Sequence, residues 1–117
     1  MPQTSSNPFA GTFDGCGYTI SGININSTSN YVGLFGYNTG TIKNVKLENV
    51  NIEGKQYVGG LVGYINDGTF ELCYATGEVI SEGNSVGGLI GYYYNRVGNK
   101  ISKKSYATGN VTGSNNV

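Results

Sequence analysis

The sequence VGGLVGY, residues Val58–Tyr64, occurs three times in closely similar form in this chain of 117 residues. The other copies are YVGLFGY at Tyr31–Tyr37 and VGGLIGY at Val86–Tyr92. The last glycines of the three copies are 27 and then 28 residues apart. A fixed period of this length is typical of proteins in which structural repeats stack on one another. The phrase is also rich in Val, Leu, Ile and aromatic residues, which favour β-strands.

The glycines inside the phrase indicate how closely the repeats approach each other. Glycine weakens a strand, and it is usually kept there because another segment of chain comes close to the backbone. Each copy nevertheless has a glycine before its leucine and another before its closing tyrosine. We therefore expect tight stacking of one coil on the next.

The composition excludes several classes of function. Seven Lys and Arg balance seven Asp and Glu, so nothing indicates binding to nucleic acid or to an anionic membrane. The chain has no histidine, which excludes Ser-His-Asp catalysis, Cys-His catalysis and His-ligated zinc within it. No apolar run is long enough to cross a bilayer, and the first residues have no secretory signal. We predict no cofactor, no nucleic-acid partner and no membrane insertion.

Two cysteines, Cys16 and Cys73, are too few for a four-thiolate metal site. In a solenoid they would lie about two coils apart, at roughly 4.8 Å per coil. That separation exceeds the limit of roughly 7 Å between Cα atoms that a disulfide can bridge. We expect both to be free, buried thiols, because unpaired cysteine usually packs as a small hydrophobic residue.

The segments between the copies alternate between apolar and polar residues. Tyr18–Ile25 alternates with a slip at Gly22, and Ile42–Ile52 alternates with one slip between Leu47 and Val50. Alternation of this kind is typical of strands with one buried face. The second slip predicts two strand segments that meet at a bend.

These units predict an all-β protein, a right-handed parallel β-helix (β-solenoid) of about four coils. One unit supplies two or three short strands, which bury their apolar face by stacking on a neighbouring unit. Parallel crossover connections are right-handed, which sets the expected hand. Like residues should then form ladders, such as Leu34 with Leu61 and Leu89, or Val45 with Cys73. The alternative is an antiparallel sandwich of about seven strands, which identical turns at a long fixed period disfavour.

The predicted organisation is a single domain over residues 1–117. Residues 1–30 are a lead-in, and the repeats cover approximately residues 31–56, 57–84 and 85–117. The last repeat is longer than the others, which predicts an enlarged loop. We expect the chain to be a fragment of a longer array.

The repeats resemble a known pattern, the GLUG repeat, which is named after its Gly-Leu-any-Gly core. Residues that match the core are 33–36, 60–63 and 88–91. Segments that resemble the usual continuation of the family are CYATG at 73–77 and SYATG at 105–109, and residues 9–20 resemble its lead-in.

This resemblance implies a bacterial protein with an extracellular or cell-surface location, whose export signal is not in this chain. GLUG arrays occur in large adhesin-like surface proteins and in the non-catalytic region of immunoglobulin A-specific metallopeptidases. Those peptidases need a His-Glu-x-x-His zinc motif. Because this chain has no histidine, the resemblance does not carry their activity over to it.

Two groups of tyrosines are candidates for contact with a partner. Tyr37, Tyr64 and Tyr92 close the three copies and should stack in a column. The sequence favours a stabilising aromatic ladder over a row that binds the flat face of a sugar or a protein surface. The second group lies in the enlarged loop, where tyrosines beside basic residues are suited to an acidic glycan or a partner protein, with a solvated loop as the alternative. This predicted contact site consists of Tyr92, Tyr93, Tyr94, Arg96, Lys103 and Lys104, with Lys100 nearby.

The acidic residues give no sign of catalysis. A glycosidase needs two carboxyl groups across a cleft, and no acid pair recurs between the repeats. Asp14, beside Gly15, is most simply a turn former, and a single calcium site at a turn is left as the alternative. We therefore predict that the chain is not an enzyme.

The sequence predicts a non-enzymatic structural or adhesive module of a bacterial cell-surface or secreted protein, with a host glycan or surface protein as its partner. One alternative is an accessory, non-catalytic domain of a secreted metallopeptidase or carbohydrate-active enzyme. A further alternative is a solenoid that self-assembles end to end, because the ends of a stack expose unpaired strands.

Overall fold

A computed structural model describes residues 8–94, 105–113 and 115–116, and the secondary structure within them consists of strands. The first coil contains β1 (Thr12–Asp14), β2 (Thr19–Ser21), β3 (Asn24–Asn26), β4 (Asn30–Val32) and β5 (Phe35–Asn38). The second contains β6 (Thr41–Lys43), β7 (Lys46–Gly54), β8 (Gln56–Gly59) and β9 (Val62–Asn66). The third contains β10 (Thr69–Glu71), β11 (Tyr74–Ser81), β12 (Asn84–Gly87) and β13 (Ile90–Tyr94), and β14 (Tyr106–Thr112) and β15 (Asn115–Asn116) follow.

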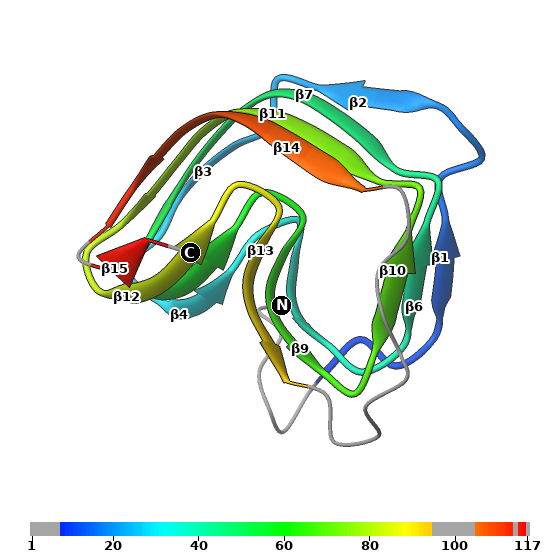
Figure 1. The fold of residues 1–117 in the computed structure, drawn as a ribbon, viewed down its shortest axis with the longest axis horizontal. Coiled ribbons are helices and arrows are strands. Elements are labelled where there is room, and N and C mark those ends of the chain that lie inside the picture. The colour runs from blue at the N-terminus through cyan, green and yellow to red at the C-terminus, as the bar shows by residue number, and fades with distance from the viewer. Residues whose placement is uncertain (1–7, 95–104, 114, 117) are drawn as a thin grey trace.

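Equivalent strands of successive coils pair in parallel and form four sheets that surround one core (Figure 1). The orders are β1-β6-β10, β14-β11-β7-β2 with β3 also on β7, β15-β12-β8-β4, and β13-β9-β5. This arrangement confirms the predicted parallel β-solenoid. It has about three turns rather than four, because the lead-in and the first copy of the phrase together make a single coil.

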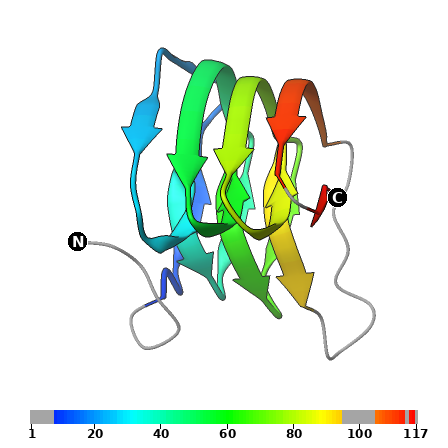
Figure 2. The ribbon, with the colours of Figure 1, turned by 90° about the vertical axis from the view of Figure 1, so that its left-hand side faces the viewer.

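The solenoid is right-handed, as predicted. In Figure 1 the chain runs counterclockwise from β2 at the top, through β3 and β4 on the left, to β5 and then to β6 on the right. The later coils lie nearer the viewer. Figure 2 shows the same advance from the side, with the coils following one another from the N-terminal to the C-terminal end.

The predicted ladders are present in the expected register. The amide of Leu61 donates a hydrogen bond to the carbonyl oxygen of Leu89 at 2.9 Å, and the amide of Phe35 donates to that of Leu61 at 2.8 Å. Tyr74 pairs with Lys46, which places the preceding residues Cys73 and Val45 opposite each other. The sequence period is therefore the period of the backbone ladder.

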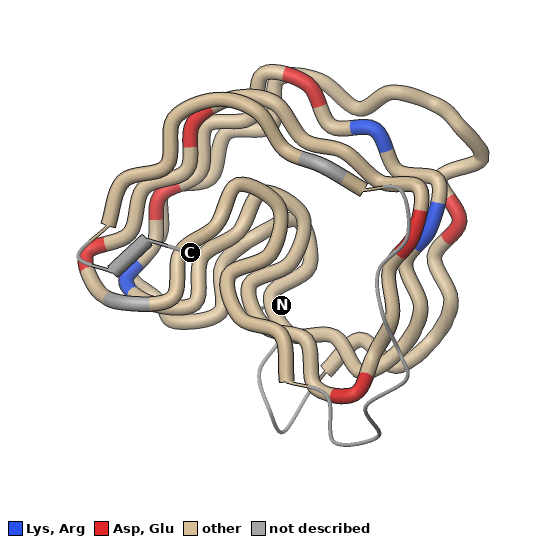
Figure 3. Tube along the Cα trace, in the orientation of Figure 1, with Lys and Arg blue, Asp and Glu red and all other residues tan. Residues whose placement is uncertain are grey.

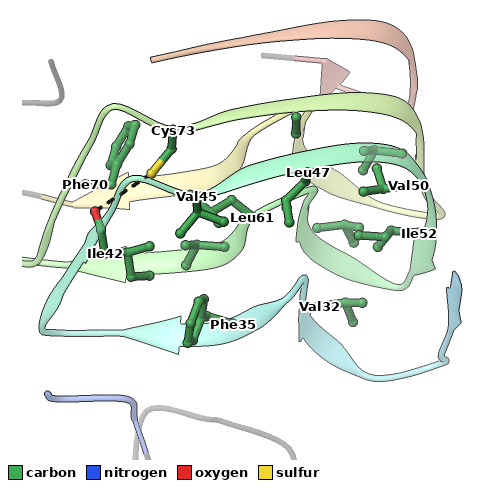
Figure 4. Close-up of a cluster of buried hydrophobic side chains, with 14 of the residues drawn as sticks. Val32, Phe35, Ile42, Val45, Leu47, Val50, Ile52, Leu61, Phe70 and Cys73 are labelled. Carbon is green, nitrogen blue, oxygen red and sulfur yellow. Dashed lines mark hydrogen bonds between the residues drawn. The ribbon is translucent and has the colours of Figure 1, made fainter. Parts of the chain in front are cut away.

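Apolar residues of the alternating segments fill the space between the sheets (Figure 4). Ile42, Leu47 and Ile52 of the middle coil have no exposed surface, since coils cover them on both sides. Ile42 lies between Phe13 and Phe70 in the ladder. Burial of such side chains contributes about 1.5–3 kcal/mol each, so the middle coil holds the most stabilising part of the core.

The break in alternation within Ile42–Ile52 corresponds to a β-bulge in one strand and not to the predicted bend between two strand segments. β7 is continuous, and the extra residue is accommodated at Asn49, which has a φ of 56°. The register against β11 shifts at the same place. In the first coil the equivalent slip does divide the strand, since Gly22, with a φ of 75°, separates β2 from β3.

Two corners of each coil use left-handed backbone at equivalent or adjacent positions. At the corner after β6 and β10 these residues are Asn44 and Leu72, with φ of 57° and 54°. After β1 the left-handed residue is Cys16, with a φ of 56°, one position beyond the residue that aligns with Asn44. At the corner within or before β4, β8 and β12 they are Tyr31, Tyr57 and Ser85, with φ of 59°, 55° and 62°. The conformation is thus repeated by the fold even where the residue type does not favour it.

The glycines of the phrase lie where coils meet closely, as expected. A Cβ added at Gly91 would lie 2.5 Å from the carbonyl oxygen of Gly63 in the coil below. A Cβ at Gly63 would lie 2.7 Å from the carbonyl oxygen of Gly36. Real Cβ atoms essentially never approach so closely, so only glycine fits without movement of the backbone.

The two cysteines are free, but only one of them is buried. Cys73 is 1% exposed, and burial raises the pKa of its thiol. Cys16 is exposed, contrary to the prediction, because it lies in the loop between β1 and β2 that projects from the coil (Figure 1). Tyr18 follows in the same loop and is 77% exposed, although the alternation placed it on the buried face. Among the described residues, no helix has the length and apolar character needed to cross a membrane.

Candidate functional site

Three tyrosines that close the copies of the phrase stack along the solenoid. The ring centroids of Tyr37 and Tyr64 are 4.8 Å apart with an interplanar angle of 5°. Those of Tyr64 and Tyr92 are 4.9 Å apart with an angle of 18°. The spacing equals that of hydrogen-bonded strands. The predicted aromatic ladder is therefore confirmed.

A second, shorter column lies beside the first. Tyr31 and Tyr57 stack with centroids 5.3 Å apart and an angle of 8°. The two columns meet edge to face, with 5.2 Å between Tyr57 and Tyr64 and 5.8 Å between Tyr57 and Tyr92. Offset-stacked and edge-to-face pairs are the arrangements that aromatic quadrupoles favour. We call the set of Tyr31, Tyr37, Tyr57, Tyr64 and Tyr92 the tyrosine array.

Sequence analysis missed the second column, although a signal was present. Tyr31 and Tyr57 each stand directly before the valine of a copy of the phrase. In the third copy this position holds Ser85, so the signal occurs only twice. The left-handed backbone at Tyr31 and Tyr57 turns their rings toward the neighbouring sheet, where the other column stands.

Exposure varies along the array from 6% at Tyr37 to 41% at Tyr92. The pKa of Tyr64 is raised, first by loss of water around the hydroxyl and then by the neighbouring tyrosines, beginning with Tyr37. The pKa of Tyr31 is raised by the same two causes, and Tyr57 makes the larger contribution of the neighbouring tyrosines. The fold therefore favours the neutral form of Tyr31 and Tyr64.

The segments that carry the array contain no charged residue. Lys, Arg, Asp and Glu are absent from residues 27–42, 56–66 and 83–95 of the sequence. Figure 3 shows the acidic and basic residues of the described coils on other sides and corners, away from the bend between β12 and β13. The array is thus a polar but uncharged aromatic surface.

The tyrosines of the predicted loop site differ in orientation. Tyr92 and Tyr94 are exposed, at 41% and 42%. Tyr93 is partly buried: its hydroxyl donates a hydrogen bond to the carbonyl oxygen of Gly68 at 2.9 Å, and its ring lies 5.7 Å from that of Phe70. Burial, followed by the negative charge of Asp67, raises the pKa of Tyr93. The basic members Arg96, Lys103 and Lys104, and Lys100 nearby, lie outside the described residues.

Two acidic residues, Asp14 and Glu48, make hydrogen bonds that join neighbouring parts of the coils. Asp14 Oδ1 accepts hydrogen bonds from Asn44 Nδ2 at 3.0 Å and from the amide of Cys16 at 2.9 Å. The bond from Asn44, followed by that from Cys16, lowers the pKa of the Asp14 carboxyl group. Glu48 Oε2 accepts from the hydroxyl of Tyr74 at 3.0 Å. Within the described ranges, no group of three or more His, Cys, Asp or Glu side chains is placed to hold a metal ion.

Comparison with known families and proteins identifies the repeat. Residues 54–80 match the family model described as the GLUG motif. The chain carries a GLUG motif. The GLUG match spans β8, β9 and β10 and most of β11, so it includes Tyr57 and Tyr64.

One curated relative is halomucin of Haloquadratum walsbyi (strain DSM 16790 / HBSQ001), which is 43% identical over 86 residues. The match covers 71% of this chain and 1% of halomucin, so the chain spans a very small part of that relative's length. The resemblance implied a bacterial source, whereas this relative is archaeal. No solved structure matches the chain.

Proposed function

We propose that this chain is a non-enzymatic structural and adhesive module of a cell-surface or secreted protein. The observation that supports it best is the in-register parallel pairing of equivalent strands in four sheets. Each coil is joined to the next by backbone hydrogen bonds on every side, which makes the stack stiff along its axis. Such a stack holds surface residues at a fixed spacing, and it sets the distance between the parts of the protein that flank it.

The comparisons support the same proposal. The relative named halomucin supports the proposed extracellular setting. The GLUG match runs from the second half of the second coil into the first half of the third, so the part that resembles the family includes strands that build the stack. The adhesive component draws on the exposed aromatic residue Tyr92, which is 41% exposed at one end of the coils.

The location is tested with antibodies raised against the folded chain and applied to intact cells of the source organism. Labelling of unpermeabilised cells, or recovery of the antigen from the culture medium, is expected. Labelling that appears only after permeabilisation would contradict the proposal. Peptidase or glycosidase activity in the polypeptide that carries the antigen would identify the accessory-domain alternative.

Adhesion is tested with beads that carry the chain at high density. We expect such beads to attach to glycan- or protein-coated surfaces more than beads that carry the unfolded chain. Equal attachment of the two kinds of bead would contradict the adhesive function and leave only the structural function in the proposal.

A further inference from the structure

The shorter tyrosine column stops one coil before the longer one. Val86 pairs with Val58, so Ser85 lies opposite Tyr57 at the position where a third ring would stand. In the longer column Tyr92 continues to this level and contacts Tyr57 edge to face at 5.8 Å and 85°. Within the described part of the chain, the face of Tyr57 that points away from Tyr31 has no ring stacked on it.

Ser85, Tyr57 and Tyr92 therefore form a corner with the dimensions of one ring. A ring at the level of Ser85 would repeat the 5.3 Å stacking that Tyr31 makes on Tyr57. It would also meet Tyr92, just as Tyr57 meets Tyr64 at 5.2 Å. Tyr92 is 41% exposed, which leaves its surface accessible from solution.

The chemistry of this corner matches a neutral sugar. The faces of aromatic rings are negative and attract weakly positive C–H bonds, such as those on one face of a pyranose. The hydroxyl groups of Ser85 and the tyrosines both donate and accept hydrogen bonds, as the rim of a sugar requires. Residues 83–95 and 56–66 contain no charge to pair with an acidic sugar.

We propose that this corner binds one pyranose ring of a neutral glycan, stacked on Tyr57 at the level of Ser85 and held against Tyr92. This inference rests on the proposed adhesive function and gives it a ligand class. It also differs from the site expected from sequence, because it uses the uncharged array and not the basic loop.

The test is a titration of the folded chain with neutral tetrasaccharides of glucose, galactose, mannose or N-acetylglucosamine, followed by NMR of the tyrosine rings. At least one of them should shift the ring signals of Tyr57 and Tyr92. Hyaluronan and oligogalacturonate, which carry carboxylates, should bind more weakly. Absence of binding by every neutral probe, or binding by the acidic probes alone, would overturn the proposal.

Three variants locate the binding. Ser85→Tyr places the missing ring in the corner and should abolish binding while the fold is kept, because Tyr31 and Tyr57 already adopt the same backbone conformation. Tyr92→Ala removes the wall of the corner and should weaken binding about tenfold. Tyr94→Ala is the matched control, since Tyr94 is equally exposed at 42% but lies outside the array.

The variants also separate this proposal from other occupants. Unchanged binding in both Ser85→Tyr and Tyr92→Ala would overturn it, as would an equal loss in Tyr94→Ala. A sedimenting mass that rises with concentration in the unmodified chain but not in Ser85→Tyr would show that a second copy of the chain fills the corner, and would likewise overturn it. Surface labelling by antibody does not depend on the corner, so the proposed location is judged independently.

Discussion

Gly63 shows at the scale of one residue how the coils constrain the sequence. A Cβ at this position would lie 2.5 Å from the carbonyl oxygen of Tyr57 and 2.7 Å from the amide nitrogen of Val32. Both are backbone atoms that belong to sheet ladders and are not free to move. The glycine is therefore required by the close approach of backbone from its own coil, at Tyr57, and from the coil below, at Val32, and not by its own backbone dihedrals.

We predict that Gly63→Ala lowers the free energy of unfolding by about 3 kcal/mol, at the upper end of the usual cost of overpacking. Urea denaturation followed by circular dichroism measures the change. Gly11→Ala is the control, since an added Cβ there would have the Phe9 ring as its nearest neighbour at 3.7 Å. Equal effects of the two substitutions would refute the role given to close coil contact.

Leu72 is a residue that the fold holds in an unfavourable conformation. Its φ is 54° and its side chain is 47% exposed, so it has the strain of left-handed backbone and little burial to offset it. Asn44 takes the same corner in the coil below with a φ of 57°. Asparagine tolerates this conformation better than leucine does.

Leu72→Asn should therefore raise the free energy of unfolding by about 1 kcal/mol. The same urea experiment measures it, with Leu72→Ala as the control that removes the exposed side chain but keeps the strain. If the alanine variant gains as much as the asparagine variant, loss of exposed apolar surface and not relief of strain is the cause.

Two tyrosines of the array, Tyr31 and Tyr64, make the stability of the folded chain depend on pH. The raised pKa values of Tyr31 and Tyr64 mean that the folded chain holds their protons more tightly than the unfolded chain, in which the ordinary value is 10.0. Their contribution to stability is complete below that value. This contribution to stability is lost as the pH rises from 10.0 through the higher pKa values of the folded chain, because the unfolded state ionises first.

We predict that the free energy of unfolding falls steadily above pH 10, and that Tyr64→Phe, which cannot ionise, makes the fall less steep. Urea denaturation at a series of alkaline pH values measures the slope. Tyr18→Phe is the control, since Tyr18 is 77% exposed and stands outside the array. An identical slope in the Tyr64 variant would contradict the prediction.

The sequence predicts the strands and their pairing better than it predicts the side-chain contacts. The alternation of apolar and polar residues in Ile42–Ile52 indicates which side chains are buried. The repeated phrase predicts the parallel register. The orientation of Tyr93 has no such signal, because three consecutive tyrosines are alike in sequence, and the middle one is distinguished by its contacts with Phe70 and Gly68 in the fold. Exposure of Cys16 depends on a projecting loop, which a local pattern does not specify.

At the scale of the whole molecule, the described residues include strands at each end of the stack that pair with a single neighbouring strand. In the described residues β10 and β13 each pair with one neighbour, β6 and β9. At the other end β1 likewise pairs with one neighbour, β6, whereas Phe9 bridges Asn38 at the end of β5. Unpaired edges of this kind act as templates for another strand.

We predict that the chain associates end to end, so that its average mass in sedimentation equilibrium rises with concentration. Replacing Ile90, in the edge strand β13, by proline would remove a backbone donor and lower the association. Val62→Pro in the middle coil is the control, and it should unfold the chain. A constant monomer mass over the accessible concentrations would exclude end-to-end assembly.

The register of the ladders also bears on how such proteins change over generations. Thr69 pairs with Thr41, and Thr41 with Thr12, so each coil offers the next one the same docking surface. Gene recombination that duplicates or deletes one whole coil therefore leaves every remaining interface intact. A one-residue insertion within a strand would instead move its buried side chains to the outside. Selection can therefore change the length of the stack by whole coils, while the requirement to fold keeps the number of residues within a strand fixed.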